Sequence, residues 1–120
     1  MKINTLILLV LASLLVTCDG PREDISRDVV FYVEFDDNHF SAGNSCEFFF
    51  NHPNGGLDSV FLADTSYTSP ILLFNKGDTI NCSLRYCNED VQAMIFVDDS
   101  LWQSFYAYRL TDEYFQDILP

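Results

Sequence analysis

Short segments in which apolar and polar residues alternate recur along this chain, and they favour a protein built from β-strands. In the clearest segment, from Thr79 to Tyr86, every second residue is apolar: Ile80, Cys82, Leu84 and Tyr86. Side chains of a strand point alternately to its two faces, so this pattern predicts one buried face and one solvated face. An amphipathic helix would instead repeat its apolar residues every three or four positions.

We expect seven short strands, separated by turn-forming residues; in the strand 91–97 apolar residues lie on both faces. They cover residues 29–35, 46–50, 57–63, 70–74, 79–86, 91–97 and 101–110. The stretch Pro53-Asn54-Gly55-Gly56 favours a turn because Asn and Gly tolerate positive φ, and Asp98-Asp99 has the length of a two-residue hairpin turn. Beyond Thr111, which can cap a helix, apolar residues at positions 114, 115, 118 and 119 predict a short helix over 112–119.

Strands that follow one another without intervening helices predict an all-β domain, here an antiparallel β-sandwich with a short C-terminal helix. An immunoglobulin-like architecture of about seven strands fits this pattern, and a small β-barrel is the alternative. Trp102 is the only tryptophan and follows all four cysteines, so the Cys…Trp…Cys spacing of antibody domains is absent. The term immunoglobulin-like therefore describes an architecture here and implies no kinship.

The first eighteen residues have the layout of a secretory signal peptide. Lys2 provides a positive start, and residues 6–16 form an uncharged apolar run shortly before Cys18. This run has eleven residues, whereas a membrane-spanning helix needs about 20. The residues Leu15-Val16-Thr17-Cys18 resemble the lipobox of bacterial (Gram-negative) lipoproteins. In that family the cysteine is acylated on its sulfur and becomes the first residue of the mature protein.

The resemblance implies a lipid anchor on Cys18 and divides the chain into three parts. Residues 1–17 would be the signal peptide, residues 18–28 the lipidated cysteine with a flexible acidic tether, and residues 29–120 the β-sandwich domain. The implied location is the outer membrane, on its periplasmic or its surface face. The alternative is an ordinary signal peptide cut near Gly20, which would release a secreted protein.

The chain is strongly acidic, with a net charge of −12. All 18 acidic residues follow the signal segment, and loss of Lys2 would leave five basic residues, so the mature side chains would sum to about −13. Such a charge repels nucleic-acid phosphates and anionic lipid surfaces, and we expect neither as a partner. It either keeps a surface protein soluble or attracts a basic protein.

Cysteines of an exported protein are expected to form disulfides. If Cys18 carries lipid, three cysteines remain and at most one bridge forms; if Cys18 is retained without lipid, two bridges can form. On one extended strand Cys82 and Cys87 would lie about 16 Å apart, too far for a disulfide. We therefore expect Cys46 to pair with either Cys82 or Cys87, and buried free thiols are the alternative.

The sequence contains no arrangement typical of a catalytic centre. His39 and His52 lie in expected loops outside any recognisable motif, whereas a hydrolase needs a nucleophile, a base and an orienting group. The adjacent pairs Asp36-Asp37 and Asp98-Asp99 could serve a glycosidase or bind Ca²⁺, but neighbours on a strand point apart and the DxDxDG loop is absent. The sequence has no CxxC motif that would suggest a zinc site. We expect no enzyme, no metal and no cofactor.

A binding role is the remaining expectation. Trp102, Tyr106 and Tyr108 fall on one side of the expected strand 101–110. If this side faces solvent, it offers an aromatic surface to a glycan or a protein; if it faces inward, it belongs to the core. We therefore predict a lipid-anchored cell-envelope protein with a non-catalytic binding or structural role. The alternatives are an acidic periplasmic inhibitor or immunity-type protein that binds a basic enzyme and, less favoured, a secreted hydrolase.

Overall fold

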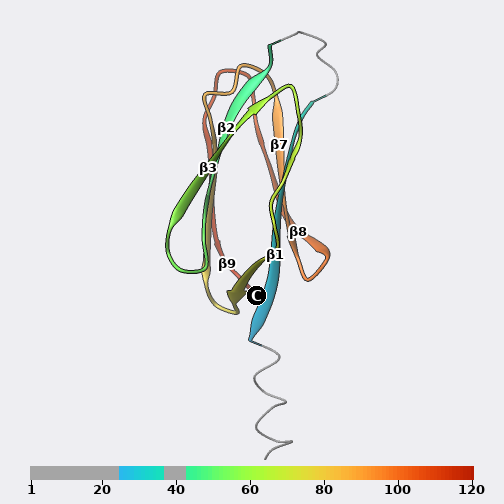
Figure 1. Ribbon diagram of the computed structural model, residues 1–120. Coiled ribbons are helices and arrows are strands. Elements are labelled where there is room, and N and C mark those ends of the chain that lie inside the picture. Colours follow the sequence, from blue (N-terminus) through green and yellow to red (C-terminus); the bar gives the residue numbers. More distant parts are fainter. Residues whose placement is uncertain (1–24, 37–42) are drawn as a thin grey trace, which may run out of the picture.

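The computed structural model describes residues 25–36 and 43–120, and this part of the chain contains strands and no helix. The strands form two antiparallel sheets that face one another (Figure 1). The all-β, sandwich-like fold predicted from the alternation is confirmed. The small barrel considered as an alternative is wrong, because the two sheets remain separate and do not close on themselves.

Sheet A contains five strands. At its centre β1 (Ser26–Phe35) pairs with β7 (Val91–Val97), which in turn pairs with the edge strand β8 (Ser100–Ala107). Two short strands, β4 (Tyr67–Thr68) and β5 (Leu72–Asn75), also pair with β1. This arrangement leaves β8 at an edge of the sheet.

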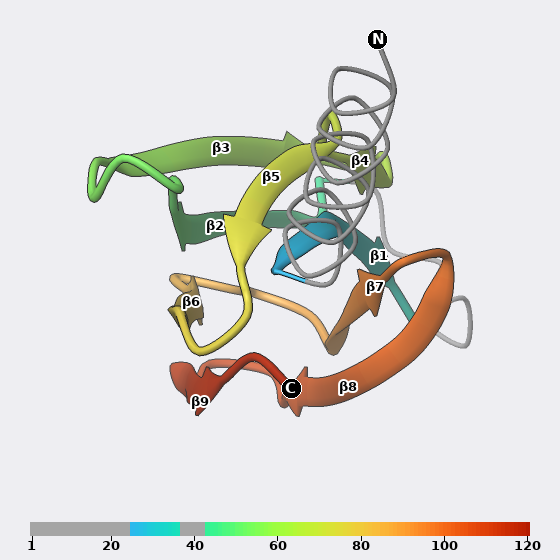
Figure 2. The same cartoon turned by 90° about the horizontal axis from the view of Figure 1, so that it is seen from below.

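Sheet B contains four strands in the order β3 (Leu57–Ala63), β2 (Ser45–Asn51), β6 (Thr79–Arg85) and β9 (Glu113–Ile118). Only β3 and β9 are edge strands, so β2 and β6 are hydrogen-bonded on both sides. Figure 2 looks along the strands and shows the two sheets as neighbouring rows, with β8 and β9 next to one another at their edges.

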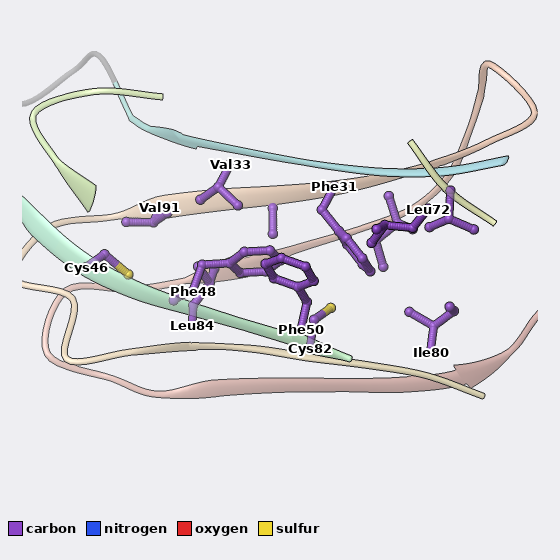
Figure 3. Close-up of a cluster of buried hydrophobic side chains, with 14 of the residues drawn as sticks. Phe31, Val33, Cys46, Phe48, Phe50, Leu72, Ile80, Cys82, Leu84 and Val91 are labelled. Carbon is purple, nitrogen blue, oxygen red and sulfur yellow. The ribbon is translucent and has the colours of Figure 1, made fainter. Parts of the chain in front are cut away.

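Three phenylalanines occupy the centre of the core between the sheets (Figure 3). Phe31 of β1 meets Phe48 and Phe50 of β2 with ring centroids 5.7 and 5.2 Å apart, and the last two stack at 5.5 Å. All three are completely or almost completely buried. Each lies on the inward face of its strand, where every second side chain is buried, as the alternation of side chains along a strand requires.

The predicted hairpin turn at Asp98-Asp99 is confirmed. Both residues have positive φ, 49° and 66°, and Val97 pairs with Ser100 directly across the turn. Positive φ at both central positions is the pattern of a type I′ turn, whose twist matches that of the flanking strands. The carboxylate of Asp98 also accepts a hydrogen bond from the backbone N–H of Asp28 at 3.0 Å, which ties the turn to β1.

Residues 112–119, predicted to form a helix, instead contain strand β9. Its residues pair with β6 from Thr79↔Ile118 to Leu84↔Glu113. A segment this short gains little from helix formation by itself, whereas pairing satisfies backbone groups along the open side of β6. The apolar residues at 114, 115, 118 and 119 fit a helical stripe, but pairing with β6 decides their conformation.

The remaining strand predictions agree with the structure except at a few ends. The segments 57–63 and 91–97 match β3 and β7 throughout, and β1 begins at Ser26 instead of at Val29. The predicted strand 70–74 is displaced to β5, since Pro70 has no N–H to donate to a neighbouring strand. The last predicted strand ends at Ala107 instead of residue 110, and Leu110 has a positive φ of 64°.

Candidate binding surface around Arg85

Sheet B turns an unusually aromatic face away from the core. Because side chains alternate along a strand, the residues between the buried positions of β2, β3, β6 and β9 point outward. We call this surface the Arg85 face and define it by Phe49, Leu57, Phe61, Asn81, Ser83, Arg85, Tyr114 and Gln116. Leu57, Phe61 and Tyr114 are 70%, 67% and 64% exposed. Exposed apolar groups gathered on one face are typical of a surface that meets a partner.

Arg85 lies between two aromatic rings of this face. Its guanidinium carbon is 4.7 Å from the centroid of the Phe49 ring and 5.0 Å from that of the Tyr114 ring. The register explains this arrangement, since Phe49 and Tyr114 are both partners of Ser83 on the neighbouring strands. Both distances lie within the ~6 Å over which a ring face attracts a cation. The two rings therefore hold the positive charge in a fixed place.

The guanidinium has no carboxylate partner in the described part of the chain. Glu47 is the register partner of Arg85 on β2, yet no ion pair joins Arg85 to it or to any other described residue. The Nε atom of Arg85 is buried and makes no hydrogen bond. Buried polar atoms nearly always have a partner, and leaving a charged donor without one costs free energy. Arg85 is thus a cation whose bonding capacity is not used within the described structure.

A groove of about 210 Å³ lies beside Arg85 along β6. Phe49, Leu57 and Tyr114 line it with apolar surface, and Ser83, only 4% exposed, lies between the two rings. Asn81 and Gln116, which pair across β6 and β9, line the part farther from Arg85. Arg85 and Asn81 are four residues apart on one strand, roughly 13 Å. The groove therefore has a cationic end and an amide end.

The described residues that line the groove offer three kinds of group to a ligand. Among the described residues, the lining includes neither a histidine nor a carboxylate, the side chains that most often transfer protons in enzymes. What the lining residues offer is a fixed positive charge, ring and aliphatic surface, and neutral hydrogen-bonding groups. A surface of this kind can hold a ligand in a defined orientation.

The two candidate catalytic histidines are placed differently. His39 lies outside the described residues. His52 follows β2, and its Nε2 is 3.1 Å from Oδ2 of Asp58 across the β2–β3 hairpin. This hydrogen bond is the main reason why the pKa of Asp58 is lowered, and the backbone N–H of Ser59, donating to the same carboxylate, lowers the pKa further. The pair joins the two strands of an exposed hairpin.

The acidic pairs that suggested glycosidase or calcium chemistry are only partly described. Asp37 lies outside the described residues, and Asp98 and Asp99 form the β7–β8 turn. Asp98 also lies 3.6 Å from Nε of Arg27. Across residues 25–36 and 43–120, no group of three or more His, Cys, Asp or Glu side chains is placed to hold a metal ion.

A β-bulge separates the aromatic residues expected on one side of the last predicted strand. The register of β7 with β8 shifts by one residue at Trp102, and the alternation shifts with it. Trp102 packs against the core and meets the ring of Phe115 edge-on at 5.9 Å. Tyr106 and Tyr108 remain exposed and stack on one another at 6.5 Å. The three residues thus form no single surface, and a binding role of the tyrosine pair stays a prediction.

The candidate disulfide residues divide into one bridge and one thiol. Cys46 of β2 is bonded to Cys87, which follows β6, so the bridge joins β2 to the segment that leaves the neighbouring strand of the same sheet. In antibody domains the bridge instead joins the two sheets, and the immunoglobulin-like arrangement stays a prediction. Cys82 is free and buried, and its burial raises the pKa of the thiol to about 12. Cys18 lies outside the described residues.

The sequence pattern alone did not identify the Arg85 face. Alternation put Arg85 on the polar side of segment 79–86, but its ring partners lie on two other strands. One of them, Tyr114, lies in the segment that the sequence predicts to be a helix. The available signal was the outward position of Phe49 in segment 46–50, where a polar residue is usual on a solvated face.

The described ranges contain no helix with the length and apolar character needed to cross a membrane. A scan against protein-family models finds no family that matches this chain, and a search of curated proteins likewise finds no match. The geometry of the Arg85 face is therefore the basis for a functional conclusion.

Proposed function

We propose that this chain is a small exported, lipid-anchored cell-envelope protein that binds a ligand through the Arg85 face and catalyses no reaction. The observation that carries the binding role is the state of Arg85. Its guanidinium is held between two rings, has no ion pair with a described residue, and contains a buried Nε without a partner. Arg85 as a whole is partly exposed, so the rest of its guanidinium can donate hydrogen bonds to a bound partner, and hydrogen bonds from a charged donor are the strong ones.

The anchoring part of the proposal rests on the lipobox-like residues that end at Cys18. The first strand begins at Ser26, so only the short segment 19–25 would separate a lipidated Cys18 from the sandwich. Fully extended, seven residues reach about 25 Å at most. A lipid on Cys18 would therefore keep the domain close to the membrane surface.

Metabolic labelling with an alkyne fatty acid tests the anchor. We expect the label on the wild-type protein and on the matched variant Cys82→Ser, and its loss in Cys18→Ser. Mass spectrometry should show Cys18 as the first residue of the mature chain. An unlabelled mature protein, or a mature N-terminus other than Cys18, would refute the lipid anchor.

Radical footprinting on intact cells tests the binding face. Tyr114 on the Arg85 face and Tyr108 beyond β8 are almost equally exposed, 64% and 63%, and so provide an internal comparison. We expect Tyr114 to be oxidised more slowly in cells than in the purified protein, while the rate for Tyr108 stays the same. Equal rates for Tyr114 in both settings would contradict the proposal, and protection of Tyr108 alone would move the binding role to the tyrosine pair.

An acidic inhibitor or immunity-type protein is the second candidate, favoured by the side-chain charge of about −13 on the mature chain. Such a protein would capture a cationic enzyme rapidly, and added salt would weaken the capture. A pull-down at low salt should then yield one basic enzyme that is lost at high salt. Recovery of no cationic protein under these conditions would count against this candidate.

A further inference from the structure

We infer that the ligand of the Arg85 face is an oligosaccharide that bears a carboxylate, as in uronic-acid sugars, with the carboxylate bound to Arg85 and the hydroxyl groups placed along Asn81 and Gln116. This inference rests on the proposed function, because it names the ligand of the same face. It follows from the chemistry of the two ends of the groove and from the charge around them.

The cationic end favours a carboxylate. A guanidinium donates two parallel hydrogen bonds to a carboxylate, and the planar fork of Arg suits this geometry. Phe49 and Tyr114 hold the guanidinium in place, so little side-chain freedom is lost when the ligand binds. Arg85 is the only cation among the described residues that line the groove, which suits a group with a single negative charge better than a phosphate or a cluster of sulfates.

The amide end favours hydroxyl groups. Asn81 and Gln116 each carry both donors and an acceptor, and Ser83 adds a hydroxyl between the rings. Sugars present donors and acceptors together, whereas an acidic peptide side chain presents acceptors only. The exposed side chains of Leu57 and Tyr114 add apolar surface beside these groups, against which the C–H face of a sugar ring can pack. A sugar that places a carboxylate at the cationic end and hydroxyl groups along the rest fits the whole groove.

The surrounding charge restricts the ligand further. Glu47 is the register partner of Arg85, and the chain as a whole carries −12. Long-range electrostatics therefore repels anions, and attraction must come from direct contact with Arg85. A polyanion with several charges on each ring, such as a heavily sulfated glycan, would be excluded, while a sugar with at most one carboxylate on each ring would be accepted. Replacing Glu47 with a neutral residue should strengthen binding.

Calorimetric titration of the full-length mature protein in detergent tests this inference. The probes are a short oligogalacturonate, the same oligosaccharide with its carboxylates reduced to alcohols, and a peptide rich in Asp and Glu. We expect the oligogalacturonate to bind at least about tenfold more tightly than the reduced sugar, since a hydrogen bond to a charged group contributes about that factor. The acidic peptide should bind more weakly than the oligogalacturonate.

Single-residue variants test whether Arg85 binds the carboxylate of the sugar. Arg85→Gln should weaken the affinity for oligogalacturonate about 10- to 100-fold, and Arg85→Lys should weaken it less, because a charge remains without the planar fork. Arg109→Gln removes the same charge from an exposed residue that does not line the groove, and should leave the affinity unchanged. Glu47→Gln should raise the affinity, because it removes a negative charge beside Arg85. Thermal unfolding of each variant checks that the fold is retained.

Three outcomes would overturn the inference: equal affinity for the acidic and the reduced sugar, unchanged affinity in Arg85→Gln, or tighter binding of the acidic peptide. The last would assign the face to a protein partner. If no probe binds but Tyr114 is still protected on cells, the sugar class is refuted while the proposed binding face stands. If Tyr114 is also unprotected, both are refuted.

Discussion

At the scale of single residues, burial determines how Cys82 reacts. Its thiol is free and buried, and the loss of solvation raises its pKa to about 12. Because the thiolate is the reactive form, only about one molecule in 10,000 carries it at pH 8. We expect iodoacetamide at pH 8 to leave Cys82 unmodified in the native protein and to modify it in denaturant. Mass spectrometry of the native and unfolded protein measures both.

An exposed thiol provides the comparison for Cys82. Ser104 lies on an exposed position of β8, and Ser104→Cys should be alkylated in the native protein at the rate of a small-molecule thiol. If Cys82 reacts as fast as this introduced cysteine, then the native structure does not shield it.

A second residue-scale effect concerns the pKa of Asp58. The hydrogen bond from His52 lowers this pKa below 3.8, so the folded state holds its proton less tightly than the unfolded state. The stabilisation is complete above the unfolded value and is lost as the pH falls through the folded value. We expect His52→Ala to raise the pKa of Asp58 toward 3.8, measured by NMR titration of its carboxyl carbon.

The second hydrogen-bond donor to Asp58 provides a control for the effect of His52 on the pKa. Ser59 donates from its backbone N–H, which Ser59→Ala retains, so this variant should keep the lowered pKa. A pKa of Asp58 that is the same in His52→Ala and in the wild type would show that the hydrogen bond does not lower it.

At the scale of elements, the β7–β8 turn shows how one backbone position limits stability. Asp99 has a φ of 66°, a conformation that costs a residue with a side chain about 1 kcal/mol and costs glycine nearly nothing. We expect Asp99→Gly to stabilise the protein by about 0.5–1 kcal/mol in thermal or urea unfolding. Ser100→Gly, one residue into β8, should instead destabilise it by a similar amount. Stabilisation by both changes would mean that the turn conformation is not the cause.

The elements also show why some predictions succeeded and others failed. Strands such as 57–63 and 91–97 were predictable because a short apolar segment bounded by turn-forming residues is a local property of the sequence. Strand β9 was not, since its conformation depends on hydrogen bonds to β6, which is distant in the sequence. The bulge at Trp102 was hidden for a similar reason, because it is a mismatch between two strands and leaves no mark in either one alone.

At the scale of the whole molecule, the candidate site exists only because the sheet brings distant segments together. Phe49, Arg85 and Tyr114 come from three strands that are adjacent in sheet B and far apart in the chain. The outward position of Arg85 was predictable from its own segment. The choice of its neighbours was not, because strand order depends on the complete topology. Prediction therefore reached the fold class but not the binding surface.

The disulfide acts at this same scale, because it links two segments that are far apart in the sequence. Cys46 lies near the start of β2, and Cys87 lies in the connection that leads from β6 in sheet B to β7 in sheet A. The bridge closes a loop with a sequence separation of 41 residues. The loop-entropy relation gives about 3–4 kcal/mol of stabilisation for a loop of this length, through restriction of the unfolded chain.

We expect the double variant Cys46→Ala/Cys87→Ala to lose about 3–4 kcal/mol in urea unfolding. Its m-value should rise, because a chain without the cross-link exposes more surface when it unfolds. Cys82→Ala removes a buried thiol without opening a loop, so its m-value should equal that of the wild type. An unchanged m-value in the double variant would show that the bridge does not restrict the unfolded chain. A loss no larger than that of Cys82→Ala would show that strand pairing alone holds β2 beside the segment that follows β6.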